Sequence, residues 1–236
     1  MPRARTMLPT AVYVGLAVAD ILAAGRPSRT SQRLRHVLKP ALMPALTAAF
    51  LDGTRDRTPR PGTRVLVPGT TAAQALSWGG DVALLGTGSR SFLAGVGSFF
   101  AAHVAYIAAF LSVRGEATDR DTAALRAALG LWLAAAPAMS LAAGRKDPAL
   151  RGPVAAYATI LIAMFASSRV LDPALPPGAR ATLQAGTALF LASDSVLAIQ
   201  KFVLAEPIPV LDSVVMATYT AGQGLIAAGV TAAASA

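Results

Sequence analysis

Residues 91–113 read SFLAGVGSFFAAHVAYIAAFLSV, and this stretch contains no Asp, Glu, Lys or Arg. Arg90 precedes it and Arg114 follows it, so charged side chains stand at both of its ends. A helix needs about 20 consecutive apolar residues to cross the hydrocarbon core of a bilayer. The stretch therefore predicts a transmembrane helix, and the rest of the chain repeats the pattern of apolar runs separated by short charged segments.

The composition of the whole chain favours lipid over water as its solvent. Of the 236 residues, 54% are hydrophobic and 14% are charged, whereas a soluble domain carries about a quarter charged residues. The net charge of +9 does not indicate nucleic-acid binding, because Lys and Arg lie almost entirely between the apolar runs. Anionic lipid headgroups are the expected partners of basic residues placed there. The absence of Cys excludes disulfides and thiolate chemistry.

This pattern predicts an all-α fold, namely an integral membrane bundle of about eight transmembrane helices that forms a single domain over residues 1–236. The expected spans are residues 7–25, 38–52, 64–87, 91–113, 122–143, 150–170, 180–203 and 209–234. Abundant Ala and Gly within the spans permit close helix approach. We expect a multi-pass protein of a bacterial cell membrane. Lys and Arg divide almost equally between the two sets of loops, so the positive-inside rule does not decide the orientation.

Few ionisable residues lie inside the predicted spans, and each is a functional candidate because inserting a charge there costs at least about 2.5–3.5 kcal/mol. They are Asp20, Asp81, His103 and Asp194, with Lys39 and Lys201 at the ends of spans. Counting along the spans places His103 near the middle of the membrane and the others in the half opposite the chain termini. We call that half the distal half, and we expect one polar chamber that opens there.

Polar side chains share helix faces with these residues. The expected faces are Gln74, Ser77, Trp78 and Asp81 in the third span, Phe99, His103 and Tyr106 in the fourth, Thr187, Asp194 and Lys201 in the seventh, and Tyr219 and Gln223 in the eighth.

Structural roles compete with functional ones for several of these residues. Asp20 is expected to pair with a neighbouring residue, and Lys201 is expected to reach lipid headgroups. His103 is either a hydrogen-bonded structural residue or part of a site. For Asp81 and Asp194 the functional interpretation is favoured, because two buried carboxylates in one half of a membrane are hard to justify otherwise.

Short motifs follow one another along the predicted spans in a defined order. They are Lys39-Pro40, Ser77-Trp78-Gly79-Gly80-Asp81, the segment from Phe99 to Tyr106, Tyr157 with Met164, Ser193-Asp194, and the segment from Tyr219 to Gln223. In this order they resemble the YhhN-like family of multi-pass membrane proteins, which includes the lysoplasmalogenases. The resemblance extends from about residue 10 to about residue 230.

The resemblance implies hydrolysis of the vinyl ether bond of a lysoplasmalogen, which yields a fatty aldehyde and a glycerophospho-ethanolamine or -choline. Such chemistry requires a carboxylic acid that protonates the alkene and a carboxylate that stabilises the oxocarbenium ion and activates water. Asp81 and Asp194 are the expected catalytic pair, with the acid and base roles unassigned. The expected substrate-binding residues are Lys39, for the phosphate, and Gln74, Trp78, His103, Tyr106, Tyr157, Tyr219 and Gln223. We expect a lysophospholipid as the partner, with no metal and no cofactor.

Three alternatives to this function stay open. One is a proton-coupled transporter of lipids or small molecules, although such proteins usually show internal repeats and the chain shows none. A second is a hydrolase of another ether or ester lysolipid, because a fold can persist while its substrate changes. The third is a metal-dependent hydrolase with Asp81, His103 and Asp194 as ligands, although one His without Cys is a poor zinc set.

Overall fold

The computed structural model describes residues 3–55, 58 and 60–235. The predicted single domain of residues 1–236 therefore includes residues 1, 2, 56, 57, 59 and 236, which lie outside the described part. Within that part the chain contains no named strand, which confirms the predicted all-α class. The helices are α1 (Arg3–Ala24), α2 (Arg29–Arg55), α3 (Leu66–Ala83), α4 (Gly88–Leu111), α5 (Thr122–Lys146), α6 (Arg151–Ser167), α7 (Pro177–Ala198) and α8 (Pro209–Ala234).

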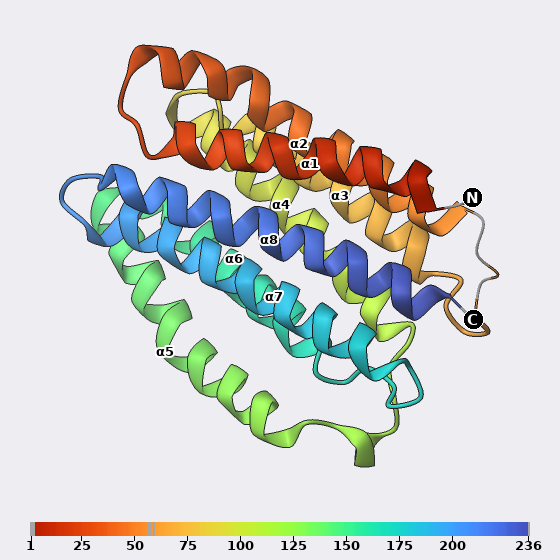
Figure 1. Cartoon of the computed structure of the whole chain (residues 1–236). Helices are drawn as coiled ribbons and strands as arrows, with labels where there is room; N and C mark the ends of the chain where they lie inside the picture. The colour runs from red at the N-terminus through yellow and green to blue at the C-terminus, as the bar shows by residue number, and fades with distance from the viewer. Residues whose placement is uncertain (1–2, 56–57, 59, 236) are drawn as a thin grey trace.

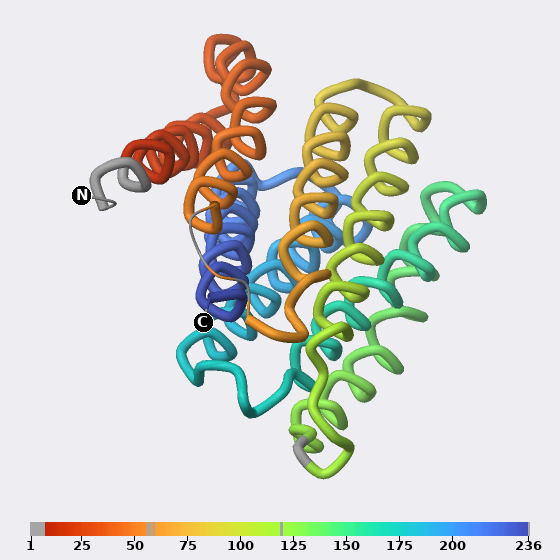
Figure 2. The backbone as a smooth tube through the Cα atoms, turned by 90° about the vertical axis from the view of Figure 1, so that its right-hand side faces the viewer, coloured from red at the N-terminus to blue at the C-terminus, as the bar shows by residue number. Residues whose placement is uncertain are grey.

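The helices pack as antiparallel hairpins of consecutive elements, because short connections place sequential helices side by side. The four hairpins are α1–α2, α3–α4, α5–α6 and α7–α8 (Figure 1). The α3–α4 hairpin lies between the α1–α2 and α5–α6 hairpins (Figure 2). Helix α8 contacts α1, α2 and α3 as well as α7. The two chain termini lie at the same end of the bundle (Figure 1), so the opposite end is the distal end.

Five helical segments of the described residues are long and apolar enough to cross a membrane, which supports an integral membrane protein. They are Gly88–Leu111, Thr122–Lys146, Pro148–Ser167, Pro177–Val203 and Pro209–Ala234. The segment Leu8–Ala24 of α1 is apolar but shorter. Each of these segments overlaps one of the spans expected from the sequence.

Helices α2 and α3 differ from the spans expected at 38–52 and 64–87. Helix α2 begins nine residues earlier, at Arg29, because Arg is a good helix former and Arg35 is held by an ion pair with Asp20. Lys39 therefore lies about 15 Å along α2 at 1.5 Å per residue, rather than at its start. Helix α3 ends at Ala83, and a short turn over residues 84–87 leads into α4, whose first residue, Gly88, adopts a φ of +87° that favours glycine.

Helices α7 and α8 approach to backbone contact along a seam of glycines. A Cβ atom placed on Gly186 would lie 2.8 Å from the carbonyl oxygen of Gly222, and one on Gly222 would lie 2.9 Å from that of Gly186. Small residues at helix interfaces permit such close packing where lipid is the solvent. The seam holds the α7 residues of the site described below close to those of α8.

Candidate active site

A cavity of about 140 Å³ lies between the helices of the distal half. Apolar side chains form most of its wall, including Phe99 of α4, Leu131 of α5 and Leu161 of α6. The ionisable and phenolic side chains that line it are Lys39, Asp81, Tyr157, Asp194, Lys201 and Tyr219. The cavity therefore combines two carboxyl groups and two ammonium groups with apolar walls, and such walls suit the chain of a lipid.

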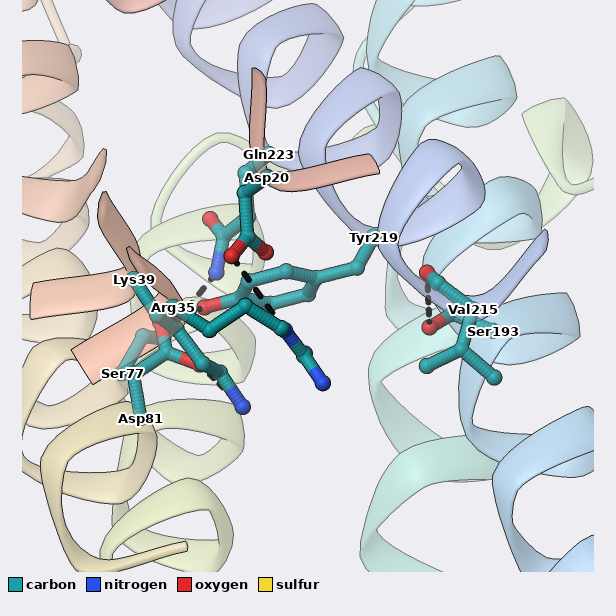
Figure 3. Close-up of polar contacts among 9 residues, drawn as sticks. All are labelled: Asp20, Arg35, Lys39, Ser77, Asp81, Ser193, Val215, Tyr219 and Gln223. Carbon is teal, nitrogen blue, oxygen red and sulfur yellow. Dashed lines mark hydrogen bonds and ion pairs between the residues drawn. The ribbon is translucent and has the colours of Figure 1, made fainter. Parts of the chain in front are cut away.

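Asp81 lies in the last turn of α3 and is almost fully buried, with 1% of its surface exposed. Its Oδ2 atom accepts a hydrogen bond of 2.8 Å from the Tyr219 hydroxyl of α8. Its Oδ1 atom lies 3.4 Å from the Lys39 ammonium of α2, as Figure 3 shows. The ammonium balances the charge of the carboxylate, which offsets part of the cost of burying it.

Asp194 of α7 has a different set of partners. Its Oδ2 atom accepts a hydrogen bond of 2.5 Å from the Tyr157 hydroxyl of α6. Among the described residues no Lys, Arg or His nitrogen lies within 4 Å of its carboxyl group. The preceding residue, Ser193, donates a hydrogen bond of 3.0 Å to the Val215 carbonyl of α8 (Figure 3), which fixes this part of α7 against α8.

His103 of α4 lies behind Tyr157 and outside the cavity lining. Its Nδ1 atom lies 2.5 Å from the Phe99 carbonyl oxygen, so Nδ1 carries the proton and donates it. Its ring packs edge-to-face on Tyr157, with centroids 5.4 Å apart, and on Phe190, with centroids 4.9 Å apart. The Nε2 atom is buried without a hydrogen-bond partner. His103 thus supports the ring that holds Asp194.

Three more of the predicted substrate-binding residues form a buried polar layer behind Asp81. Tyr106 donates a hydrogen bond to Oε1 of Gln223, and Nε2 of Gln223 donates one of 3.0 Å to Ser77 (Figure 3 shows the last pair). Gln74 accepts a hydrogen bond of 2.9 Å from Thr47 of α2. Tyr106, Gln223 and Gln74 are fully buried and do not line the cavity. They connect α2, α3, α4 and α8 around the site.

Trp78 lies on the outer face of α3, with 45% of its surface exposed, and is not part of the cavity lining. Its Nε1 atom donates a hydrogen bond of 2.9 Å to the Pro40 carbonyl of α2. That carbonyl lacks its usual helical donor, since residue 44 is also a proline and has no N–H. The indole therefore replaces the missing donor and ties α3 to α2 one residue beyond Lys39.

Structural roles were expected from the sequence for both Asp20 and Lys201, but the two side chains make different kinds of contact. Asp20 is buried and lies 3.3 Å from Nε of Arg35, so it has the structural partner expected for it (Figure 3). The sequence offered no means of choosing Arg35, which stands among several basic residues of the segment after α1. Lys201 lines the cavity and lies over the Phe92 ring, 4.1 Å from its centroid. The i, i+7 spacing of Asp194 and Lys201 was the signal that pointed to this position.

The set Asp81, His103 and Asp194 does not form a metal-binding group. Within the described part of the chain, no three His, Asp or Glu side chains come close enough to hold a metal ion.

A model of the YhhN family matches residues 34–230. The chain belongs to the YhhN family. The matched range begins within α2 and ends within α8, so it includes every polar side chain of the cavity. The resemblance inferred from the motifs is thereby confirmed. Comparisons with curated proteins and with solved structures gave no match.

Proposed function

We propose that this chain is a membrane-embedded hydrolase of the vinyl ether bond of lysoplasmalogens, with Asp81 and Asp194 as its catalytic residues. Membership of the YhhN family is consistent with a lysoplasmalogenase-like activity. The observation that carries the proposal is the shared cavity, because two carboxyl groups with unlike partners border one apolar space. Acid–base chemistry on an oxocarbenium-like transition state requires such a pair in two different protonation states.

The partners of the two aspartates support a different role for each. Asp81 has a cation at 3.4 Å and acts as the carboxylate. Asp194 has no cation within ion-pair distance among the described residues and acts as the carboxylic acid, because an unpaired buried charge is costly. Tyr219 and Tyr157 orient the two carboxyl groups through their hydroxyls.

The reaction begins when Asp194 donates its proton to the alkene carbon that is β to the ether oxygen. The resulting oxocarbenium ion is stabilised by the Asp81 carboxylate, and water adds to its carbon while Asp81 accepts a proton from that water. The product of this step is a hemiacetal. Its hydroxyl proton passes to Asp194 and the proton on Asp81 passes to the ether oxygen, so the C–O bond breaks. The fatty aldehyde and the glycerophospho-ethanolamine or -choline leave, and both aspartates regain their starting states.

The other predicted site residues act at different distances from the substrate. Lys39, Tyr157 and Tyr219 border the cavity and contact the substrate or the catalytic water. The remaining residues act through neighbours, since each is hydrogen-bonded or packed behind the lining: Gln74, Trp78, His103, Tyr106 and Gln223.

The protein crosses the membrane eight times as a single domain, in a bacterial cell membrane. Support for spans by α1 to α3, beyond the five apolar segments, comes from large apolar side chains on their outer faces. On α1, Leu8 is 70% exposed and Leu22 is 55% exposed; on α2, Val37 is 68% exposed; and on α3, Val82 is 41% exposed. Lipid is the medium in which such surfaces are stable without a protein partner.

Product analysis by mass spectrometry tests the reaction. Purified protein in detergent is incubated with a lysoplasmalogen and, separately, with the ester-linked lysophospholipid of the same chain length. We expect aldehyde from the vinyl ether substrate and no fatty acid from the ester. Asp81→Asn and Asp194→Asn should each lower turnover about 10²–10⁴-fold, the range typical of a catalytic acid or base.

Asp172→Asn is the matched control, because Asp172 lies in the loop before α7 and uses Oδ1, which Asn retains, to accept from Ala174. Full activity of both catalytic-site variants would overturn the proposal, as would cleavage of the ester substrate alone. Uptake of lipid into vesicles along a proton gradient, without any product, would replace the hydrolase by the transporter alternative.

A further inference from the structure

The cavity contains two lysines in unlike surroundings. The side chain of Lys39 is 11% exposed, and its ammonium lies 3.4 Å from Asp81. Lys201 is exposed, and within the described residues its ammonium has no carboxylate within 4 Å. The ammonium of Lys201 lies instead over the ring of Phe92, 4.1 Å from the centroid. One cation is thus already neutralised by an acid, and the other is available to an anion.

We propose that Lys201 binds the phosphate of the lysophospholipid, so that the cavity has a phosphate subsite at the end of α7. This inference rests on the proposed function and names the group that recognises the substrate's headgroup. A flexible ammonium is well suited to a phosphodiester, to which it donates charge-assisted hydrogen bonds. Leaving the face of Phe92 breaks only a cation–π contact, whereas Lys39 would have to leave its carboxylate.

The spacing along α7 fits the dimensions of the substrate. Lys201 follows Asp194 by seven residues, which is about 10 Å along a helix at 1.5 Å per residue. In a lysoplasmalogen about seven bonds separate phosphorus from the alkene carbon that is protonated, and an extended chain covers roughly 8 Å over that many bonds. A phosphate on Lys201 therefore leaves the vinyl ether beside Asp194. A phosphate on Lys39 would instead lie against Asp81, where two anions repel each other.

The local backbone around Lys201 is also unusual. Residues Ile199–Val203 form one turn of π-helix, labelled η3, at the end of α7. Single turns of π-helix are rare and are found frequently at functional sites. The ammonium of Lys146 on α5 donates to the carbonyl oxygens of Lys201, at 2.7 Å, and Leu204, at 3.3 Å. Lys146 is therefore a positioning residue that holds this turn and adds a second positive charge near the subsite.

Two phenylalanines form the apolar side of the same subsite. Phe92, at the start of α4, packs edge-to-face on Phe202 with ring centroids 6.1 Å apart. Both rings line the cavity, and Phe202 also packs with Ala143 of α5 and Val154 of α6. The rings give the ammonium a fixed resting place at the boundary between the apolar cavity and the distal end of the bundle.

Equilibrium binding to purified protein in an uncharged detergent tests the subsite independently of catalysis. The probe is a lysophospholipid with a saturated alkyl ether chain, which has no vinyl ether bond to hydrolyse. The second probe is the 1-alkylglycerol of the same chain length, which lacks the phosphate, and the third is inorganic phosphate. Lys201→Gln should weaken binding of the first probe about tenfold, the loss expected for a hydrogen bond to a charged group. Binding of the 1-alkylglycerol should not change, and Lys201→Arg should restore most of the affinity.

Steady-state kinetics on the lysoplasmalogen provide a second readout. Lys201→Gln should raise KM about tenfold while kcat changes by less than about threefold, because the lost interaction is equal in the ground and transition states. Lys146→Gln should raise KM less than Lys201→Gln does, and Lys146→Gln should have little further effect when it is added to Lys201→Gln, because Lys146 acts by positioning Lys201. Arg145→Gln, which removes an exposed charge from the same turn of α5, is the matched control and should leave KM unchanged.

The outcomes separate this inference from the proposed function. If the lysoplasmalogen is hydrolysed and Lys201→Gln changes neither KM nor phospholipid affinity, the phosphate subsite is refuted and the hydrolase stands. If no vinyl ether is cleaved but phospholipid affinity depends on Lys201, the hydrolase is refuted and the phosphate subsite stands. Inorganic phosphate that binds in a Lys201-dependent manner, with unchanged phospholipid affinity in Lys201→Gln, would overturn the assignment to a lipid headgroup.

Discussion

Asp81 and Asp194 border the same cavity, yet the regions around them are built differently. The Asp81 region gathers charged and polar side chains from α2, α3 and α8, including Lys39 and Tyr219. The Asp194 region joins α6 and α7, and there Tyr157 is the hydrogen-bond partner of the carboxyl group. Two side chains of one type thus receive different electrostatic surroundings, and the proposed mechanism uses this difference to give one the role of the carboxylate and the other the role of the acid.

Removal of the Lys39 charge should abolish the electrostatic difference between the two aspartates. Among substitutions of the residues that contact the aspartates, it should lower kcat the most. Lys39→Gln leaves the Asp81 carboxylate without a cation, so we expect kcat to fall about a hundredfold, with about 3–5 kcal/mol lost from stability. Lys39→Arg should retain most of both. The measurements are kcat and thermal unfolding in detergent, with Arg26→Gln, an exposed charge after α1, as the control.

One other result for Lys39→Gln would support the phosphate-binding role that was expected for Lys39 from the sequence. If KM rises and kcat is preserved, Lys39 binds the phosphate and the electrostatic distinction between Asp81 and Asp194 must have another origin. The Lys201 variants would then be expected to show no change in KM.

The two tyrosines offer a finer comparison of the same regions. Tyr157→Phe removes the hydrogen bond that the Tyr157 hydroxyl donates to Asp194, whereas in Tyr219→Phe the carboxylate of Asp81 keeps its ion pair with Lys39. We therefore expect about a tenfold fall in kcat for Tyr157→Phe and a smaller one for Tyr219→Phe, given that a hydrogen bond to a charged or reacting group contributes about 1.5–3 kcal/mol. Equal losses in both variants would contradict the assignment of unlike roles to the two carboxyl groups.

The smallest expected effect on activity comes from the seam that holds the two regions together. In Gly222→Ala the new Cβ would meet the Gly186 carbonyl oxygen at 2.9 Å and the Phe190 backbone nitrogen at 3.0 Å, so α7 must move away from α8. We expect about 1–3 kcal/mol of destabilisation and a few-fold fall in kcat, because the shift displaces Asp194 from Asp81. Gly130→Ala, in a helix position with open space around the new atom, should lose neither stability nor activity.

The comparison between the expected and observed helices shows which features are encoded locally. The eighth helix occupies residues 209–234 as expected, because proline and an apolar run define its start and length. The second was expected at 38–52 and extends over Arg29–Arg55 instead. Its first turns carry Arg29, Arg33 and Arg35, which end an apolar run but do not end a helix. Hydropathy thus located apolar segments rather than helix boundaries.

The candidate site was predictable in outline only. Counting along the spans placed Asp81, Asp194 and Lys201 in one half of the bundle, and the structure brings all three to one cavity. The place of Trp78 was not predictable, because its link to Pro40 depends on how α2 and α3 are turned toward each other. The roles of the catalytic and substrate-binding residues stay predictions until the variants are measured.

The amino-acid sequence alone determined the all-α class, the order of the helices, the membrane as solvent and the membership of the YhhN family, since these depend on apolar runs and short motifs that are local in the chain. Only the tertiary structure decided that Asp20 pairs with Arg35, that Lys39 pairs with Asp81, and that Lys201 lies over Phe92. Arg35 and Lys39 are four residues apart on one face of α2, and sequence spacing cannot say which acid each one reaches. That choice depends on the rotation and depth of α1, α2 and α3 against one another, which are properties of packing between distant segments.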